Sequence, residues 1–274
     1  MSAGFRFGPE VFSILSAFVE ERTGVHYGTA ELSIFEDKVK SRALEAGFDS
    51  ALDYYYFLRY DEGGAAETDA LTDALVVNET YFYREPDALG ALIETHLRSI
   101  AETGRRPRVW CAACSTGEEA LTLAMMLDDR RLLDVTTILA SDISRRALAR
   151  AELGEYRPRA LRAVPEDVRA RWFHDVGGGA RLRRDLHAAI EWKRLNLLDG
   201  GAIAALGSFD AILCRNVLIY FSDATVLSVV GSLAGALSPG GHLVVGASES
   251  LMRFGTLLQC EERAGSFFYT RPAR

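Results

Sequence analysis

The chain has 274 residues, of which 49% are hydrophobic and 25% charged, a balance typical of a folded protein and unlike that of disordered or fibrous chains. Its formal net charge of −7 argues against nucleic acid as a partner, and no apolar run reaches the roughly 20 residues of a membrane span. The start lacks a secretory pattern, and four cysteines make no disulfide framework, so we expect a cytoplasmic protein that does not insert into the membrane.

The first part of the chain is predicted to be helical. Residues 9–74 lack strand alternation, and apolar side chains recur at helical spacing near the start, at Val11, Ile14, Leu15, Phe18 and Val19. We predict an all-helical N-terminal domain over residues 1–77, followed by a linker and helix at 78–105.

Three further helices are expected in this domain. One covers residues 32–46 and ends at Gly47, a residue type that favours helix C-termini. The next spans residues 50–59, with Ser50 as its N-cap. The last covers residues 66–77.

From residue 106 onward the pattern changes to short apolar runs that alternate with helical stretches. The runs that read as buried strands are 108–113, 136–141, 209–214 and 242–246, and the helical stretches between them are 118–127, 145–154 and 223–237. This βαβ alternation predicts an α/β fold with a doubly wound, mostly parallel sheet over residues 106–274. Residues 267–270 are expected to add an edge strand.

The turn after the first strand carries the most informative chemistry. It contains one glycine, Gly117, and then two acids, Glu118 and Glu119, where a dinucleotide site would need several glycines and a bare helix start. The two acids would repel a diphosphate and attract an ammonium group, as in S-adenosylmethionine. Asp142 follows the next strand, at the position where an acid binds ribose hydroxyls in such folds. Complementing the helix dipole is the alternative role for the two glutamates.

Five blocks in order resemble a known family. Residues 78–85, Asn-Glu-Thr-Tyr-Phe-Tyr-Arg-Glu, resemble the Asn-x-Thr-x-Phe-Phe-Arg signature of the CheR-type chemoreceptor glutamate O-methyltransferases. Further similar blocks are 113–119, 141–144, 214–221 and 237–241 with 246–251. The chain departs from the family at Ala120-Leu121, where Pro-Tyr is frequent, and at Tyr83, where Phe is common.

The resemblance implies a Rossmann-like class I methyltransferase that esterifies glutamates of chemoreceptors during signalling adaptation. Its cofactor would be S-adenosylmethionine, its product S-adenosylhomocysteine, and no metal would be needed. Arg84 and Tyr220 would orient the substrate carboxylate. The residues implied in cofactor binding are Asn78, Thr80, Arg84, Glu118, Asp142, Asn196, Leu197, Asn216 and Val217.

The expected partners are the cytoplasmic helices of chemoreceptors, and we expect a monomer. Residues 145–194 carry 13 Lys and Arg against 7 Asp and Glu, and this basic zone could attract an acidic helix or simply be a solvated face. The side chains considered for docking are Arg157, Arg159, Arg162, Arg169 and Arg171, with Lys38, Lys40 and Arg42 on an N-terminal helix.

Residues 172–198, with Gly177-Gly178-Gly179 at a hairpin tip, match the place where some family members carry a small β-hairpin subdomain that tethers a receptor C-terminal peptide. Two other functions stay open at this stage. One is a methyltransferase of the same fold that acts on another protein or a small molecule. The other is a non-catalytic adaptor that binds the cofactor.

Overall fold

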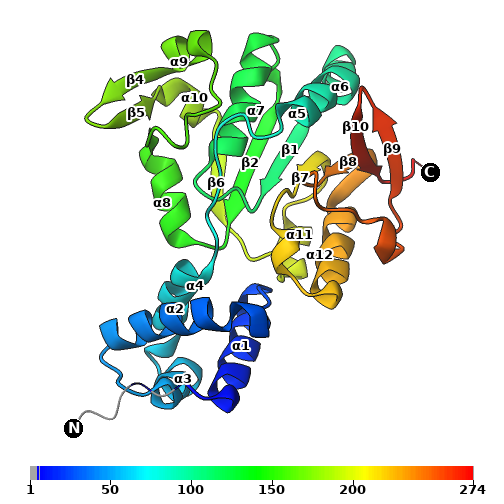
Figure 1. The fold of residues 1–274 in the computed structure, drawn as a ribbon. Coiled ribbons are helices and arrows are strands. Elements are labelled where there is room, and N and C mark those ends of the chain that lie inside the picture. The colour runs from blue at the N-terminus through cyan, green and yellow to red at the C-terminus, as the bar shows by residue number, and fades with distance from the viewer. Residues whose placement is uncertain (1–4, 6, 274) are drawn as a thin grey trace.

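The computed structural model describes residue 5 and residues 7–273. Figure 1 shows a bundle of N-terminal helices set against one end of a larger unit, in which helices flank a twisted sheet. Within the described ranges, no helix combines the length and the apolar character needed to cross a bilayer.

The N-terminal helices surround a hydrophobic core of their own. They are α1 (Pro9–Thr23), α2 (Leu32–Glu45), α3 (Ala51–Tyr60) and α4 (Gly64–Leu75), with a short 3-10 turn η1 (Thr29–Glu31). Phe35 and Tyr54 lie fully buried at the centre. Of the predicted stripe on α1, Leu15, Phe18 and Val19 are buried, whereas Val11 and Ile14 are only partly covered.

Two of the predicted helix boundaries in this region are confirmed, at Gly47 and Ser50. Gly47 follows α2 with a φ of +90°, the left-handed conformation that glycine adopts at no steric cost. The Ser50 side chain accepts a hydrogen bond from the backbone N–H of Asp53 at the start of α3. The fourth helix begins two residues earlier than expected, at Gly64, and ends at Leu75.

The larger unit is built on a sheet of seven strands in the order β6-β2-β1-β7-β8-β10-β9. The strands are β1 (Arg108–Ala112), β2 (Thr137–Asp142), β6 (Ile190–Arg194), β7 (Phe209–Leu213), β8 (Leu237–Val244), β9 (Gln259–Arg263) and β10 (Ser266–Thr270). The first five in the spatial order pair in parallel, and β10 is antiparallel to both neighbours. The predicted doubly wound, mostly parallel sheet is therefore confirmed.

One strand prediction was wrong in its position. Residues 267–270 do form most of β10, but β10 lies between β8 and β9 and is not an edge strand. The β9–β10 hairpin places the apolar strand, with Phe268 and Tyr269 buried, inside the sheet. The charged strand β9 takes the edge, because exposed polar side chains there discourage pairing with other chains.

Helices cover both faces of the sheet (Figure 1). They are α5 (Pro86–Leu92), α6 (Arg98–Glu102), α7 (Glu118–Asp129), α8 (Arg145–Leu153), α9 (Glu166–Trp172), α10 (Arg184–Ala188), α11 (Gly200–Ala205) and α12 (Asp223–Ala236), with a π-turn η2 (Ile93–Leu97) and 3-10 turns η3 (Leu133–Val135), η4 (Leu218–Tyr220) and η5 (Met252–Phe254). Along β1, Val109 and Cys111 join the core with α5 and α7, whereas Trp110 and Ala112 join the core with α11 and α12. This alternation follows from the two-residue period of a strand.

A second, small sheet stands beside the main one. Its three antiparallel strands are β3 (Glu155–Tyr156), β4 (Phe173–Val176) and β5 (Gly179–Leu182), in the order β3-β5-β4. Gly177 and Gly178 connect β4 to β5, and Gly178 has a φ of +86°. A hairpin therefore occupies the expected place. It ends well before residue 198, since β6 pairs with β2 in the main sheet.

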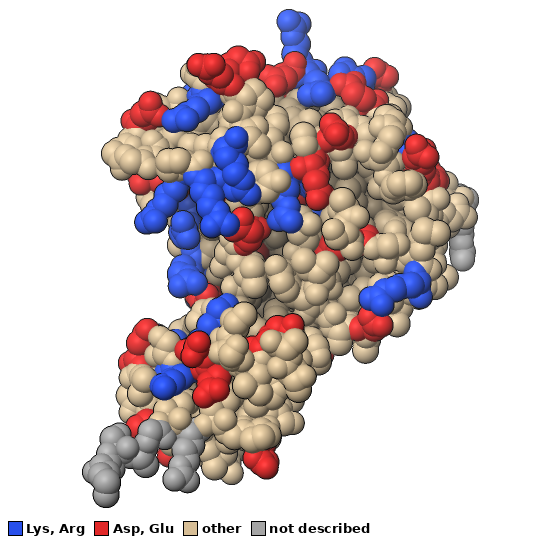
Figure 2. Space-filling view, viewed as in Figure 1, with Lys and Arg blue, Asp and Glu red and all other residues tan. Residues whose placement is uncertain are grey.

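The N-terminal helices close over the carboxyl ends of the parallel strands. Val25, just after α1, forms an isolated antiparallel bridge with Phe221, and the N–H of His26 donates to the carbonyl of Tyr220 at 2.8 Å. On the other side, α4 packs against α8. These two contacts leave a hollow between the bundle and the sheet, which is visible in Figure 2.

Candidate functional site

A cavity of about 990 Å³, part of it open to solvent, lies between the strand ends, the linker after α4 and the N-terminal helices. Nearly all the predicted site residues lie in its wall: Asn78, Thr80, Arg84, Asp142, Asn196, Leu197, Asn216, Val217 and Tyr220. Thr23, Val25, Val76 and Val77 add a wall that sequence reasoning missed, because those residues carry no signature of their own.

The turn between β1 and α7 forms the floor of the cavity. Ala113, Ser115 and Gly117 all have positive φ, of 56°, 52° and 92°. A Cβ at Gly117 would come within 2.7 Å of Trp192 Cη2 and 3.1 Å of Ala151 Cβ, so only glycine fits. In dinucleotide sites one glycine serves close packing and another faces the pyrophosphate. Gly117 has the packing role, and there is no second glycine for a diphosphate.

Asp142 is the acid at the end of β2. Its carboxylate accepts hydrogen bonds from the backbone N–H groups of Ser115 and Ser144, both at 2.8 Å. The side chain is nearly buried, and burial raises its pKa, with these bonds acting in the opposite direction. Each oxygen keeps a further lone pair, so the carboxylate can accept the hydroxyl groups of a ribose.

Glu118 lies apart from the other predicted site residues. It is not among the residues that line the cavity, and its buried carboxylate instead accepts a hydrogen bond from Thr116 Oγ1 at 2.7 Å. The next residue, Glu119, lies in the cavity wall. Successive helix residues point about 100° apart, so the two acids have different surroundings. Sequence reasoning treated the acids as a pair, whereas only Glu119 lies in the cavity wall.

A buried arginine, absent from the predicted site, holds this acid. Arg215 Nη1 lies 2.8 Å from Glu119 Oε2, and its Nη2 lies 2.9 Å from Glu85 Oε2. Burial lowers the pKa of Arg215, but the two carboxylates outweigh it and leave the pKa raised. Burial raises the pKa of Glu119, and Arg215 counteracts it. The signal that could have pointed to Arg215 is a charged residue directly after a predicted apolar strand.

The loop after β7 is held by another missed acid. Asn216 has a φ of +60°, and its N–H donates to Glu249 Oε2 at 2.7 Å. The same carboxylate accepts the N–H of Gly246 at 2.7 Å and that of Ile219 at 3.2 Å. Glu249 thereby fixes the loop that presents Asn216, Val217 and Tyr220 to the cavity.

The linker after α4 brings Asn78 and Arg84 to the cavity. Asn78 Oδ1 accepts from Ser115 Oγ at 3.2 Å, which ties the linker to the β1–α7 turn. Arg84 is flanked by Tyr83 and Glu85, at φ of 59° and 47°. Of the seven non-glycine residues with positive φ in the described chain, five lie in or beside this cavity: Tyr83, Glu85, Ala113, Ser115 and Asn216. Such strained backbone clusters at functional sites.

The polar group of Asn196 is already engaged. Its Nδ2 donates to the carbonyl of Arg22 at the end of α1, at 2.7 Å, and its Oδ1 accepts the N–H of Leu198 at 3.0 Å. Asn196 therefore joins the loop after β6 to the N-terminal helices. Leu197, beside it, supplies a buried apolar surface to the cavity.

In the predicted basic zone, residues 145–194, some arginines are matched by carboxylates and others outnumber them. Arg169 pairs with Asp175, and Arg171 with two aspartates on α7. Near the cavity, by contrast, Arg159 and Arg162 share a single carboxylate, that of Glu79. The guanidinium of Arg162 also lies 3.6 Å from the ring centre of Tyr81, a cavity residue.

The cationic residues on α2 are largely committed within the fold. Arg42 pairs with Glu67 at 2.6 Å and with Glu45 at 2.9 Å. Lys38 donates to the carbonyl of Leu75 at 3.0 Å, and burial lowers its pKa. Lys38 and Arg42 therefore contact other parts of the helical bundle, and a docking role for this helix stays a prediction.

Comparison with known proteins identifies the family. Residues 78–265 match the family model described as the CheR methyltransferase, SAM-binding domain. The chain belongs to the CheR methyltransferase family. Among its relatives, chemotaxis protein methyltransferase 2 of Vibrio cholerae is 30% identical over 92% of this chain and 89% of that protein. Chemotaxis protein methyltransferase 1 of Pseudomonas aeruginosa is 31% identical over 88% and 90%.

A third relative carries a different name. The probable biofilm formation methyltransferase WspC of Pseudomonas aeruginosa is 31% identical over 85% of this chain and 55% of that longer protein. The predicted family resemblance is thus confirmed, and S-adenosylmethionine is the cofactor of this CheR-family chain. The cavity fits it, because the turn at Gly117 has no place for a diphosphate and Asp142 is available to a ribose. Among the described residues, no His, Cys, Asp and Glu side chains group into a metal site.

Proposed function

We propose that this chain methylates glutamate side chains of chemoreceptors and so forms γ-methyl esters during signalling adaptation. The observation that carries the proposal is the cavity itself, which Arg84 and Tyr220 line together with Asp142. We place the ribose at Asp142, the ammonium group at Glu119 and the adenine beside Leu197. We propose that Asn78, Thr80, Asn216 and Val217 complete the cofactor contacts.

The reaction requires little acid–base chemistry from the protein. A glutamate side chain has an ordinary pKa of about 4.3 and is already an anionic nucleophile at neutral pH. When bound, S-adenosylmethionine supplies a methyl group on a positively charged sulfur, and S-adenosylhomocysteine remains after transfer. Burial raises the pKa of Tyr220, so its hydroxyl keeps a proton to donate to the incoming carboxylate. Arg84 orients the same carboxylate through its planar guanidinium.

Exclusion of water is the second contribution of the chain. Opposite charges cancel as the ester forms, so water stabilises the separated ions more than the transition state, and a dry site favours transfer. Val25, Val76 and Val77 supply apolar wall from the N-terminal helices and the linker. Holding the oxygen near the methyl carbon adds the advantage of proximity.

Excess positive charge beside the cavity supports an acidic partner. Among the residues that the structure describes, Arg159 and Arg162 form ion pairs only with Glu79, and Arg157 forms none. Figure 2 shows basic side chains gathered on the sheet unit above the hollow. We propose that this cluster attracts acidic receptor helices to a cytoplasmic, monomeric enzyme. The solvent-facing edge of β4 is the proposed place for a receptor C-terminal peptide.

Receptor-bearing membranes incubated with S-adenosylmethionine labelled in the methyl group test the proposal. We expect the receptor to become labelled. Base should release this label as volatile methanol, because methyl esters are base-labile. Tyr220→Phe should retain S-adenosylhomocysteine binding by calorimetry and lower the rate of labelling. Base-stable label, or label on other acceptors only, would contradict the glutamate ester assignment.

A second candidate is methylation of a receptor in another signalling system. The match to the biofilm formation methyltransferase WspC favours it. Parallel assays separate the two candidates. One uses membranes with a single chemotaxis receptor, and the other uses membranes with a single receptor from a biofilm-formation system. Preferential base-labile label on the second receptor would favour this candidate.

A further inference from the structure

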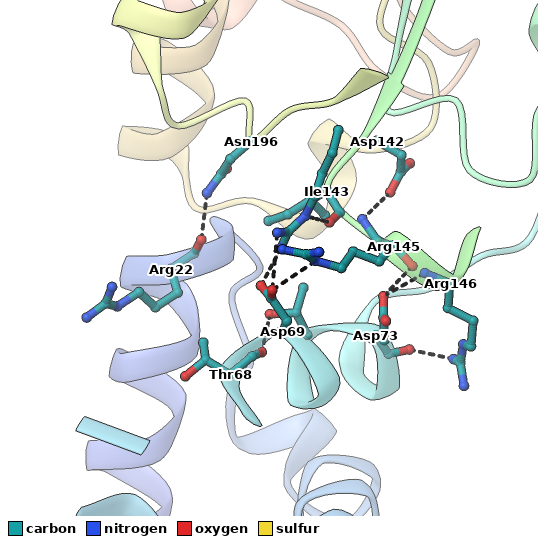
Figure 3. Close-up of polar contacts among 12 residues, drawn as sticks. Arg22, Thr68, Asp69, Asp73, Asp142, Ile143, Arg145, Arg146 and Asn196 are labelled. Atoms are coloured by element: carbon teal, nitrogen blue, oxygen red, sulfur yellow. Dashed lines mark hydrogen bonds and ion pairs between the residues drawn. The ribbon is translucent and has the colours of Figure 1, made fainter. Parts of the chain in front are cut away.

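Two aspartates on α4 contact the start of α8, on the far side of the strand end that carries Asp142. Figure 3 shows Asp69 and Asp73 pointing from α4 toward Arg145 and Arg146, with Asp142 close behind. Asp69 Oδ2 pairs with Arg145 Nε at 3.0 Å, and Asp69 also pairs with Arg194 at the end of β6. The N-terminal bundle therefore makes ionic contact with the β2–α8 and β6 loops.

Asp73 makes a different contact, directed at a side chain that leads to the cavity. Its Oδ1 accepts a hydrogen bond from Ser144 Oγ at 2.6 Å. Ser144 is fully buried, and its own N–H donates to Asp142 Oδ1 at 2.8 Å. Its hydroxyl also accepts the N–H of Ala147 at 3.0 Å and so caps α8. One serine thus connects a carboxylate of the bundle to the cavity carboxylate.

We propose that Asp73 is a positioning residue for cofactor binding, which acts through Ser144 on the orientation of Asp142. Because its hydroxyl is hydrogen-bonded to Asp73, Ser144 keeps its backbone N–H directed at Asp142 Oδ1. The backbone N–H of Ser115 binds the other oxygen, Asp142 Oδ2. The plane of the Asp142 carboxylate is therefore set from both sides. Because α4 continues directly into Val76 and Val77 in the cavity wall, the same helix positions the carboxylate and part of the enclosure. The inference rests on the proposed placement of the ribose at Asp142.

The test is isothermal titration of S-adenosylhomocysteine into the full chain and its variants. We expect Asp73→Asn to weaken binding about tenfold, because the hydrogen bond from Ser144 Oγ loses its charged acceptor and holds Ser144 less firmly. Asp69→Asn is the matched control, because it removes the same charge from the same helix without a link to Ser144. It should change affinity less than about twofold, the range of an exposed ion pair. Thermal unfolding should show a small decrease in Tm that is similar for the two variants.

A double-mutant cycle and kinetics separate positioning from a merely structural effect. In a Ser144→Ala background, Asp73→Asn should cause no further loss of affinity, whereas Ser144→Thr, which keeps the hydroxyl, should bind normally. With methylation as the readout, Asp73→Asn should raise KM for S-adenosylmethionine and leave kcat unchanged.

Three negative results are distinguishable. If Asp142→Asn leaves S-adenosylhomocysteine binding unchanged, the ribose placement is wrong and the role of Asp73 falls with it. If Asp142→Asn weakens binding but Asp73→Asn behaves like Asp69→Asn, the site placement stands and the positioning role is refuted. Independent, additive losses from Asp73→Asn and Ser144→Ala would refute the connection through the serine.

Discussion

Gly117→Ala tests whether the β1–α7 turn depends on close packing as well as on backbone conformation. Gly117 has a φ of +92°, and an added Cβ would lie 2.7 Å from Trp192 Cη2. Left-handed backbone costs a non-glycine residue about 1–2 kcal/mol, and overpacking a filled site costs about 1–3 kcal/mol. We therefore expect a loss of about 2–5 kcal/mol in the free energy of unfolding, measured by urea denaturation.

Gly104→Ala is the matched control for this experiment. Gly104 precedes β1 with a φ of +81°, and a Cβ there would meet no atom within 4 Å. It should lose only the conformational part, about 1–2 kcal/mol. Trp192→Leu should restore some stability to Gly117→Ala by making room for the methyl group. Equal losses for the two alanine variants, with no recovery in the double variant, would refute the packing argument.

Three further predictions concern buried polar groups. Burial lowers the pKa of His242 to about 3. The free energy of unfolding should therefore fall as pH drops from about 6.5 toward 3, by up to about 1.4 kcal/mol per pH unit. In His242→Phe, the free energy of unfolding from urea denaturation should depend less on pH over this range. Glu249→Gln should weaken S-adenosylhomocysteine binding about tenfold by calorimetry, because the bond to the Asn216 N–H loses its charge; unchanged affinity would contradict its role in the loop. Arg215→Met should cost about 3–5 kcal/mol in urea by leaving Glu119 buried and unpaired, and adding Glu119→Gln should recover part of it.

Much of the site could be predicted from local pattern. Strand runs, the single glycine before two acids and the acid after the second strand all reflect short-range constraints, which periodicity and turn chemistry express directly. The family blocks then placed Asn78, Arg84 and Tyr220 in one cavity, where the structure puts them. The helix ends at Gly47 and Ser50 were predictable for the same local reason.

Contacts between distant segments were decided only by the folded chain. Which of Glu118 and Glu119 lines the cavity depends on the rotation of α7 against the sheet, and the position of β10 inside the edge depends on how the last hairpin docks. The connection from Asp73 to Asp142 spans about 70 residues of sequence and exists only because α4 docks on α8. Such contacts result from how whole elements pack, and a linear pattern of residue types carries no information about that geometry.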